Sequence, residues 1–245
     1  MRRLSRATRL VRDAARDFTH AGRAQAAANW TRWRGRSSFP LGDSDCDPVP
    51  VVLLPGILER STYLLPLGRF LCARGHPVHV VDALGWNISS LEESVERCLQ
   101  TLEDKDVHGA VLVAHSKGGL IAKALLLDER LGDDAVGAVT VATPFAGSTL
   151  GGRLQRLVRR SPLGLFSPDN EDLERLAAER GVNSKIVSLA PVWDQMIPGG
   201  SYLEGAHNVT LADGGHFRPV NDPAVWEQIH THLHELARRD GGESS

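Results

Sequence analysis

The sequence predicts an α/β fold with a mostly parallel sheet, and three observations lead to that prediction. Short β-branched segments alternate with longer helical segments from residue 48 onward, which is the wiring of a parallel sheet covered by helices on both faces. The segment 111–113 (Val-Leu-Val) is continuously apolar, as expected for a strand that is buried on both sides. A chain of 245 residues that is 42 % hydrophobic is also long enough to bury such a core.

About six core strands and the helices between them follow from this alternation. The expected strands are 49–54, 78–82, 110–114, 136–142, 185–190 and 207–211. The expected helices lie near 62–74, 91–104, 117–130, 170–180 and 223–238. We therefore expect a single α/β domain over residues 49–245.

The N-terminal segment, residues 1–48, differs from the rest of the chain in charge. Residues 1–36 contain ten arginines and two aspartates, a net charge of +8, whereas residues 37–245 carry −10. Apolar residues recur at helical spacing within 2–18, so we expect a basic amphipathic helix, followed by a turn-rich linker at 37–48. Such a segment packs on the domain, forms a partly disordered solvated tail, or contacts an anionic membrane at its surface. No nucleic-acid-binding motif accompanies the charge, so we expect no nucleic-acid partner.

The composition excludes several other classes of protein. No stretch approaches the roughly 18 apolar residues of a membrane-spanning helix. Cys46, Cys72 and Cys98 are odd in number and lack a CxxC spacing, which argues against a disulfide framework and a thiolate zinc site. Arginines continue where the apolar run of a signal peptide would stand. We expect a reduced, cytoplasmic protein, with the inner face of the membrane as its peripheral location if the basic helix binds there.

One connection is longer than the others, at about forty residues. It spans 144–183 and includes several glycines, an arginine-rich patch and an expected helix at 170–180. Compact domains seldom carry such a segment unless it covers a site. A lid and a crossover helix with long flanks both fit this pattern.

The strongest chemical motif lies where a buried strand meets an apolar helix. Residues 114–118 read Ala-His-Ser-Lys-Gly, which is typical of the sharp strand-to-helix turn called a nucleophile elbow. Ser116 would stand at the apex of this turn, and small residues are needed two positions before and after it, where Ala114 and Gly118 stand. We expect Ser116 to be a nucleophile above the carboxyl edge of the sheet.

An oxyanion hole is expected from two backbone N–H groups near this serine. The first strand ends in Pro55 and Gly56, and a loop at this place supplies one donor in enzymes with a nucleophile elbow. The N–H groups of Ile57 and Lys117 fit the two positions, and Gly56 lets the backbone approach closely.

A serine nucleophile needs an oriented histidine, and the best candidate is His216. It lies in a glycine-rich loop, 213–217, between the last strand and the last helix. Asp194, which follows the strand at 185–190, is the best placed acid, so the chain order is serine, acid, histidine. The reserve acids are Asp213, Asp222 and Glu204.

No metal site or cofactor is expected from the remaining histidines. His230, His232 and His234 alternate along a helix, where only His230 and His234 share a face, and that face is expected to be solvated. His76 and His79 make a still weaker metal pair. We therefore expect neither a metal ion nor a cofactor.

With these motifs the chain resembles the α/β-hydrolase superfamily, and within it the bacterial triacylglycerol lipases and esterases with an A-H-S-x-G elbow. Three further segments, 82–87, 143–148 and 205–209, resemble loops of those enzymes. The resemblance runs from Pro50 to about Leu233 and implies the α/β-hydrolase fold and the Ser116, Asp194 and His216 triad. Its departures are Pro-Gly at the oxyanion loop, Lys117 in place of methionine and Phe145 in place of histidine.

The resemblance implies an esterase or lipase acting on a small ester or a lipid, with a role in lipid metabolism. Substrate contacts are expected from Gly56, Leu58, Trp86 and Phe145. The fold alone does not select a substrate, so two alternatives stay open. One is an acyltransferase or thioesterase acting on lipids, and the other is a non-catalytic binding protein that keeps the fold. The oligomeric state is not predicted.

Overall fold

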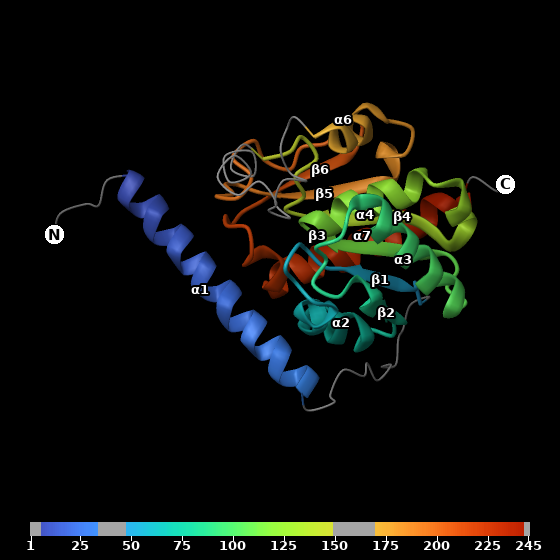
Figure 1. Cartoon of the computed structure of the whole chain (residues 1–245), viewed down its shortest axis with the longest axis horizontal. Coiled ribbons are helices and arrows are strands. Elements are labelled where there is room, and N and C mark those ends of the chain that lie inside the picture. Colours follow the sequence, from blue (N-terminus) through green and yellow to red (C-terminus); the bar gives the residue numbers. More distant parts are fainter. Residues whose placement is uncertain (1–5, 34–47, 149–169, 243–245) are drawn as a thin grey trace.

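A six-stranded sheet forms the centre of the structure, a computed structural model that describes residues 6–33, 48–148 and 170–242. All its strands run parallel in the order β2-β1-β3-β4-β5-β6 (Figure 1). The strands are β1 (Val51–Leu54), β2 (Val78–Val80), β3 (Ala110–His115), β4 (Ala135–Val141), β5 (Ile186–Pro191) and β6 (His207–Leu211). The predicted α/β fold with about six parallel strands is confirmed.

Helices cover both faces of this sheet. One face packs on α2 (Leu65–Cys72) and α7 (Pro223–Gly242). The other packs on α3 (Leu91–Asp104), α4 (Lys117–Leu127) and α6 (Glu171–Ala178). Strand β3 is buried along its whole length, because side chains on both of its faces meet a helical layer, as its continuous apolar pattern indicates.

The carboxyl edge of the sheet gathers the loops that carry the predicted site. Ser116 directly follows β3, and Asp194 and His216 lie in the loops that follow β5 and β6. In parallel sheets these edges are the usual place for binding and catalysis. The loop after β1, which contains Ile57, reaches the same edge.

The N-terminal helix α1 (Arg6–Trp33) is longer than the predicted 2–18 and extends along one side of the domain (Figure 1). It contacts the domain through its buried residue Asp17 and through Phe18, whose ring centroid lies 5.8 Å from that of Phe217. Packing on the domain, one of the hypotheses for this helix, is therefore observed. Contact of its basic face with an anionic membrane stays a prediction.

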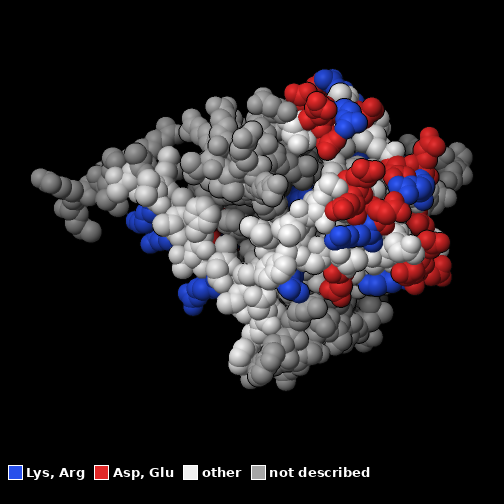
Figure 2. Space-filling view, in the orientation of Figure 1, with Lys and Arg blue, Asp and Glu red and all other residues white. Residues whose placement is uncertain are grey.

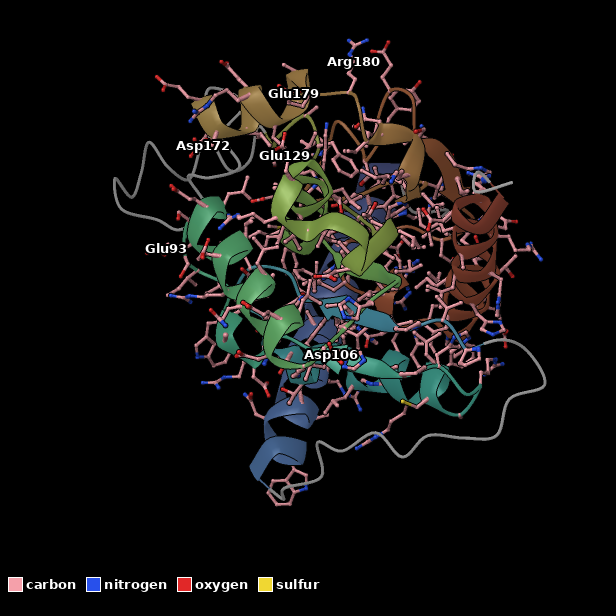
Figure 3. All side chains as sticks on the ribbon, turned by 90° about the vertical axis from the view of Figure 1, so that its right-hand side faces the viewer. Glu93, Asp106, Glu129, Asp172, Glu179 and Arg180 are labelled. Carbon is pink, nitrogen blue, oxygen red and sulfur yellow. The ribbon has the colours of Figure 1, made fainter. Side chains whose placement is uncertain are left out.

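Charge is distributed unevenly over the surface, as the sequence indicates. Basic side chains stand out along α1, whereas acidic side chains gather on the opposite side of the molecule (Figure 2). Glu93 on α3 and Asp172 and Glu179 near α6 lie on this acidic side (Figure 3). None of the helices within the described ranges combines the length and the hydropathy needed to cross a membrane.

Two predicted segments lie largely outside the described residues. The linker at 37–48 is described only at its last residue. The candidate lid at 144–183 is described at its two ends, residues 144–148 and 170–183, where α6 provides the predicted helix. The lid therefore stays a prediction.

Candidate active site

The turn between β3 and α4 holds Ser116 in an unusual backbone conformation. Its φ is 52° and its ψ is −118°, a combination that non-glycine residues rarely adopt and that costs about 1–3 kcal/mol. The Ser116 N–H donates to the Val141 carbonyl at 2.9 Å, which holds the turn against the end of β4. This geometry agrees with the predicted nucleophile elbow.

Two glycines at the start of α4 allow the elbow to pack against the neighbouring strands. A Cβ atom at Gly118 would lie 2.2 Å from the Leu54 carbonyl oxygen, and one at Gly119 would lie 2.0 Å from Thr143 Oγ1. The need for a small residue at 118 therefore comes from the end of β1. Gly118 fixes the distance between the serine turn and the oxyanion loop.

Replacing Gly118 by alanine is expected to destabilise the protein by about 3 kcal/mol, because the added methyl group must displace backbone atoms of β1. Gly22→Ala is the matched control, since a Cβ at Gly22 of α1 meets nothing within 4 Å. It should leave stability unchanged or raise it by roughly 1 kcal/mol. Urea unfolding checks both variants, and equal stability of the two would contradict the packing described.

The structure brings the three residues predicted as a triad into one chain of hydrogen bonds. His216 Nε2 lies 3.0 Å from Ser116 Oγ, and His216 Nδ1 lies 2.8 Å from Asp194 Oδ2. All three residues are buried, with exposed fractions of 6 % for Ser116, 4 % for His216 and 8 % for Asp194. The imidazole is therefore oriented by a carboxylate on one side and faces a hydroxyl on the other.

Asp194 is itself held in place by backbone donors. Its Oδ1 accepts hydrogen bonds from the N–H groups of Met196 and Ile197, at 2.7 and 2.9 Å. This leaves Oδ2 to accept from the His216 ring, so both oxygens of the carboxylate have partners.

The reserve acids have other roles. Asp222 accepts from the Ala224 N–H near the start of α7, and Glu204 pairs with Arg180 at 2.7 Å. The carbonyl of Asp213 accepts from the Val192 N–H. Among the described acids, Asp194 is the one that bonds the His216 ring.

The N–H groups of Ile57 and Lys117 stay the predicted oxyanion donors. Among the described residues no hydrogen bond uses the N–H of Ile57 or of Lys117, and the first N–H groups of a helix such as α4 have no partner within it. By contrast, the Leu58 N–H donates to Trp86 O at 2.8 Å and the Gly56 N–H donates to Glu59 at 2.7 Å.

The side chains of Asn87 and Lys117, to which the sequence analysis gave no role, hold the oxyanion loop. Asn87, at φ 52°, donates to the Pro55 carbonyl at 2.7 Å. The fully buried Lys117 ammonium donates to the carbonyls of Asn87 and Ser89 at 2.9 and 2.6 Å. The loop after β1 is thus tied to the loop at 85–89 and through it to α4.

Burial lowers the pKa of the Lys117 ammonium to about 8, below the value of 10.5 for a free lysine, with Arg97 acting in the same direction. Between these values the unfolded chain holds one more proton than the folded one, so stability should rise with pH. Relative to Lys117→Met, the wild type should gain up to about 3 kcal/mol from pH 8 to 10.5. Urea unfolding at several pH values measures this difference. Lys105→Met, at an exposed lysine, is the control. The prediction would be wrong if the stability difference between wild type and Lys117→Met did not change with pH, or if the difference for Lys105→Met changed by as much.

His115 lies beside the serine but points away from it, as expected from the sequence. Its Nδ1 lies 2.9 Å from Glu59 Oε2, and its Nε2 lies 3.0 Å from the His216 carbonyl oxygen. Burial acts to lower the pKa of this imidazole, but the adjacent Glu59 carboxylate outweighs it and the pKa is raised. This buried pair connects the oxyanion loop with the backbone of the histidine loop.

Asp17 of α1 is a further residue of the site that the sequence analysis missed. Its carboxylate is fully buried and accepts from three successive backbone N–H groups, those of His216, Phe217 and Arg218, at 2.8, 3.0 and 2.9 Å. It also accepts from the Gln195 side-chain amide at 2.5 Å. One carboxylate from the N-terminal helix thus holds both the histidine loop and the residue that follows Asp194.

The two glycines before His216 are required by this arrangement. Gly215 has a φ of 110°, and a Cβ there would lie 2.6 Å from Asp17 Oδ1. A Cβ at Gly214 would lie 2.0 Å from Trp193 Nε1. Together they let the loop curve around the Asp17 carboxylate on one side and the Trp193 ring on the other.

The residues predicted to contact substrate differ in how exposed they are. Leu58 and Trp86 expose 53 % and 37 % of their surface, and Arg60 stacks its guanidinium 4.5 Å from the centre of the Trp86 ring. Phe145 is 4 % exposed and packs in the core between the sheet and α4. The predicted substrate contacts at all four positions, Gly56 included, stay predictions.

Solved structures of α/β-hydrolases share this architecture. The mature lipase BlEst2 from Bacillus licheniformis superposes with a TM-score of 0.65 at 14 % identity, over 79 % of this chain and 95 % of the lipase. Naproxen esterase from Bacillus subtilis gives 0.51 at 14 % identity, over 79 % and 85 % of the two chains. The enol-lactonase from Burkholderia xenovorans gives 0.52 at 13 %, over 79 % and 94 %. No model of a protein family and no curated protein sequence matches this chain.

The chain therefore has the α/β-hydrolase fold, as the sequence motifs predicted. The identities are low, so the similarity establishes the fold and not the reaction. The reaction must be argued from the residues at the carboxyl edge of the sheet.

Proposed function

We propose that the protein is a serine hydrolase that cleaves carboxylic esters through an acyl-enzyme. The hydrogen-bond chain from Asp194 through His216 to Ser116 is the observation that carries this proposal. A serine hydroxyl is a weak nucleophile until a positioned base takes its proton, and a carboxylate-bound imidazole is such a base. The reaction needs no cofactor.

The triad residues and the two oxyanion donors have separate roles in the proposed reaction. His216 Nε2 accepts the proton while Ser116 Oγ attacks the ester carbonyl carbon, and Asp194 stabilises the imidazolium. The N–H groups of Ile57 and Lys117 donate to the oxyanion that forms. His216 then gives the proton to the leaving alcohol, and water releases the acyl group from Ser116 by the same steps.

An apolar surface beside the oxyanion loop supports an apolar substrate. Leu58, Trp86 and Ile88 are exposed by 53 %, 37 % and 54 %, and the hydrogen bond from the Leu58 N–H to the Trp86 carbonyl joins the two loops that carry them. Clustered exposed apolar side chains commonly mark a binding surface. The proposed substrates are therefore esters with an apolar acyl or alcohol group, lipid esters included.

A panel of p-nitrophenyl esters from acetate to palmitate tests this function with the purified full-length chain. We expect hydrolysis of at least part of the series, at rates that vary with acyl length. Product analysis with added glycerol or a thiol separates hydrolysis from acyl transfer. Folded protein that hydrolyses none of the esters and transfers none of the acyl groups would contradict the proposal.

A further inference from the structure

Three histidines meet at the amino edge of the sheet, on the side opposite to Ser116. His76 lies in the turn between α2 and β2, while His230 and His234 are one helical turn apart on α7. Their ring centroids are 5.0 to 5.2 Å apart. One potential ligand atom from each residue lies within 4.8 Å of the other two. Because α2 and α7 cover the same face of the sheet, the fold brings these distant residues together (Figure 1).

The Nε2 atoms of all three rings are buried and have no hydrogen-bond partner among the described residues. A polar atom that is buried without a partner is unfavourable, and a group of them in one place indicates a missing water or ion. The face with His230 and His234 was expected to be solvated. The structure instead leaves His230 and His234 half-buried, beside His76, which is itself 0 % exposed and completes the group.

The backbone beside His76 accommodates the tautomer that a metal ligand needs. His76 Nδ1 lies 3.0 Å from the Val49 carbonyl oxygen and 3.1 Å from the Val49 backbone nitrogen, so Val49 can accept from Nδ1–H or donate to an unprotonated Nδ1. When Nδ1–H donates to this carbonyl, the Nε2 lone pair is left for a ligand. Histidines that bind metals commonly donate their other ring N–H to a backbone carbonyl or a carboxylate in this way.

Burial is the main influence on two of these imidazoles. Burial lowers the pKa of both His76 and His230. The Arg74 charge acts on both pKa values in the same direction, and its guanidinium pairs with Glu227 at 2.6 Å and stacks on Phe70, 3.6 Å from the ring centre. A divalent ion at the histidines would therefore face no unpaired positive charge from this arginine.

We propose that His76, His230 and His234 form a binding site for a divalent transition-metal ion, with Zn²⁺ as the best fit. Imidazole nitrogens suit Zn²⁺, which takes four ligands in a tetrahedron. Water supplies the fourth ligand. A Zn–N distance of about 2.0–2.1 Å brings the ligand nitrogens to roughly 3.3 Å from one another. Rotation of the histidine side chains brings the ligand nitrogens from their present separations, of up to 4.8 Å, to this distance.

The proposed ion joins α7 to the turn before β2, at the edge of the sheet away from Ser116. Binding to the folded chain alone stabilises it by mass action, so the melting temperature rises with metal concentration. The readout is thus independent of ester hydrolysis, and failure of either proposal leaves the other intact.

The test uses the full-length chain without a histidine tag, stripped of metal with a chelator and dialysed against micromolar Zn²⁺. We expect one zinc ion per chain, a melting temperature that rises by several degrees with zinc, and loss of both effects in His230→Gln and in His234→Gln. His232→Gln is the matched control, since His232 lies on the same helix but pairs with Glu235 at 2.8 Å. It should bind zinc as the wild type does.

Co²⁺ in place of Zn²⁺ gives a second measurement that depends on no variant. The wild type is expected to show the intense visible absorption of four-coordinate Co²⁺. Lack of zinc binding, unchanged binding in both His230→Gln and His234→Gln, an equal loss in His232→Gln, or the weak spectrum of six-coordinate Co²⁺ would each overturn the proposal.

Discussion

Replacing Ser116 by alanine is expected to lower the turnover of ester hydrolysis by roughly a million-fold while leaving the fold intact. The hydroxyl is the attacking group in the proposed reaction, and no other described hydroxyl bonds to His216 Nε2. Alanine loses one atom and keeps the Cβ at this positive φ, so the elbow itself is unchanged. Steady-state kinetics on the best ester of the panel measure the effect.

Ser116 and His216 should act as a unit in catalysis. Once Ser116 is absent, His216 has no proton to accept, so Ser116→Ala with His216→Ala should be no slower than either single variant. Circular dichroism and melting temperature control for folding. A folded Ser116→Ala protein with most of its activity would overturn the proposed mechanism, and additive losses would show that the two residues act separately.

Replacing Asp17 by asparagine is expected to lower kcat by roughly a hundred-fold, which is the size of effect that a shift of about 1 Å in a catalytic group produces. The asparagine side chain is nearly isosteric but turns one acceptor oxygen into a donor that faces backbone N–H groups. Those N–H groups belong to the loop that carries His216. Asp17 is thus a positioning residue, and its loss should change kcat far more than KM.

Stability should fall as well, by about 2–3 kcal/mol, because buried backbone N–H groups lose a carboxylate acceptor. Asp13→Asn is the matched control, since Asp13 lies one turn earlier on α1 and, among the described residues, pairs with the surface arginines Arg12 and Arg16, at 3.5 and 3.6 Å. Its activity should equal that of the wild type. A folded Asp17→Asn protein with normal kcat, or an equal loss in Asp13→Asn, would show that α1 does not position His216.

Local patterns explain why much of the fold was predictable. Apolar runs and helical periodicity placed all six strands and the helices α3, α4, α6 and α7 close to their observed bounds. The arrangement of Ser116, Asp194 and His216 was also predictable, because parallel strands direct the loops that follow them to one edge. Each of these inferences needs only a short segment and the direction of its strand.

Contacts between distant segments were not predictable in this way. Asp17 is 199 residues from His216, and in the sequence it appears as one acid in an arginine-rich segment. A signal was present, since Asp17 lies beside Phe18 on the apolar stripe of the helix. Likewise, nothing in the spacing of His76 shows that it faces His230 and His234, because the register between α7 and the turn before β2 is set by packing.

Labelling with a fluorophosphonate probe tests the central claim most directly. Oγ of an activated serine attacks phosphorus, the P–F bond breaks and fluoride leaves, so one covalent adduct marks the nucleophile. We expect a single adduct per chain, mapped by mass spectrometry to the peptide that contains Ser116. The adduct should be absent in Ser116→Ala and strongly slowed in His216→Ala. A folded wild-type chain that takes up no probe, or that carries the label at another residue, would contradict the assignment of Ser116 as an activated nucleophile.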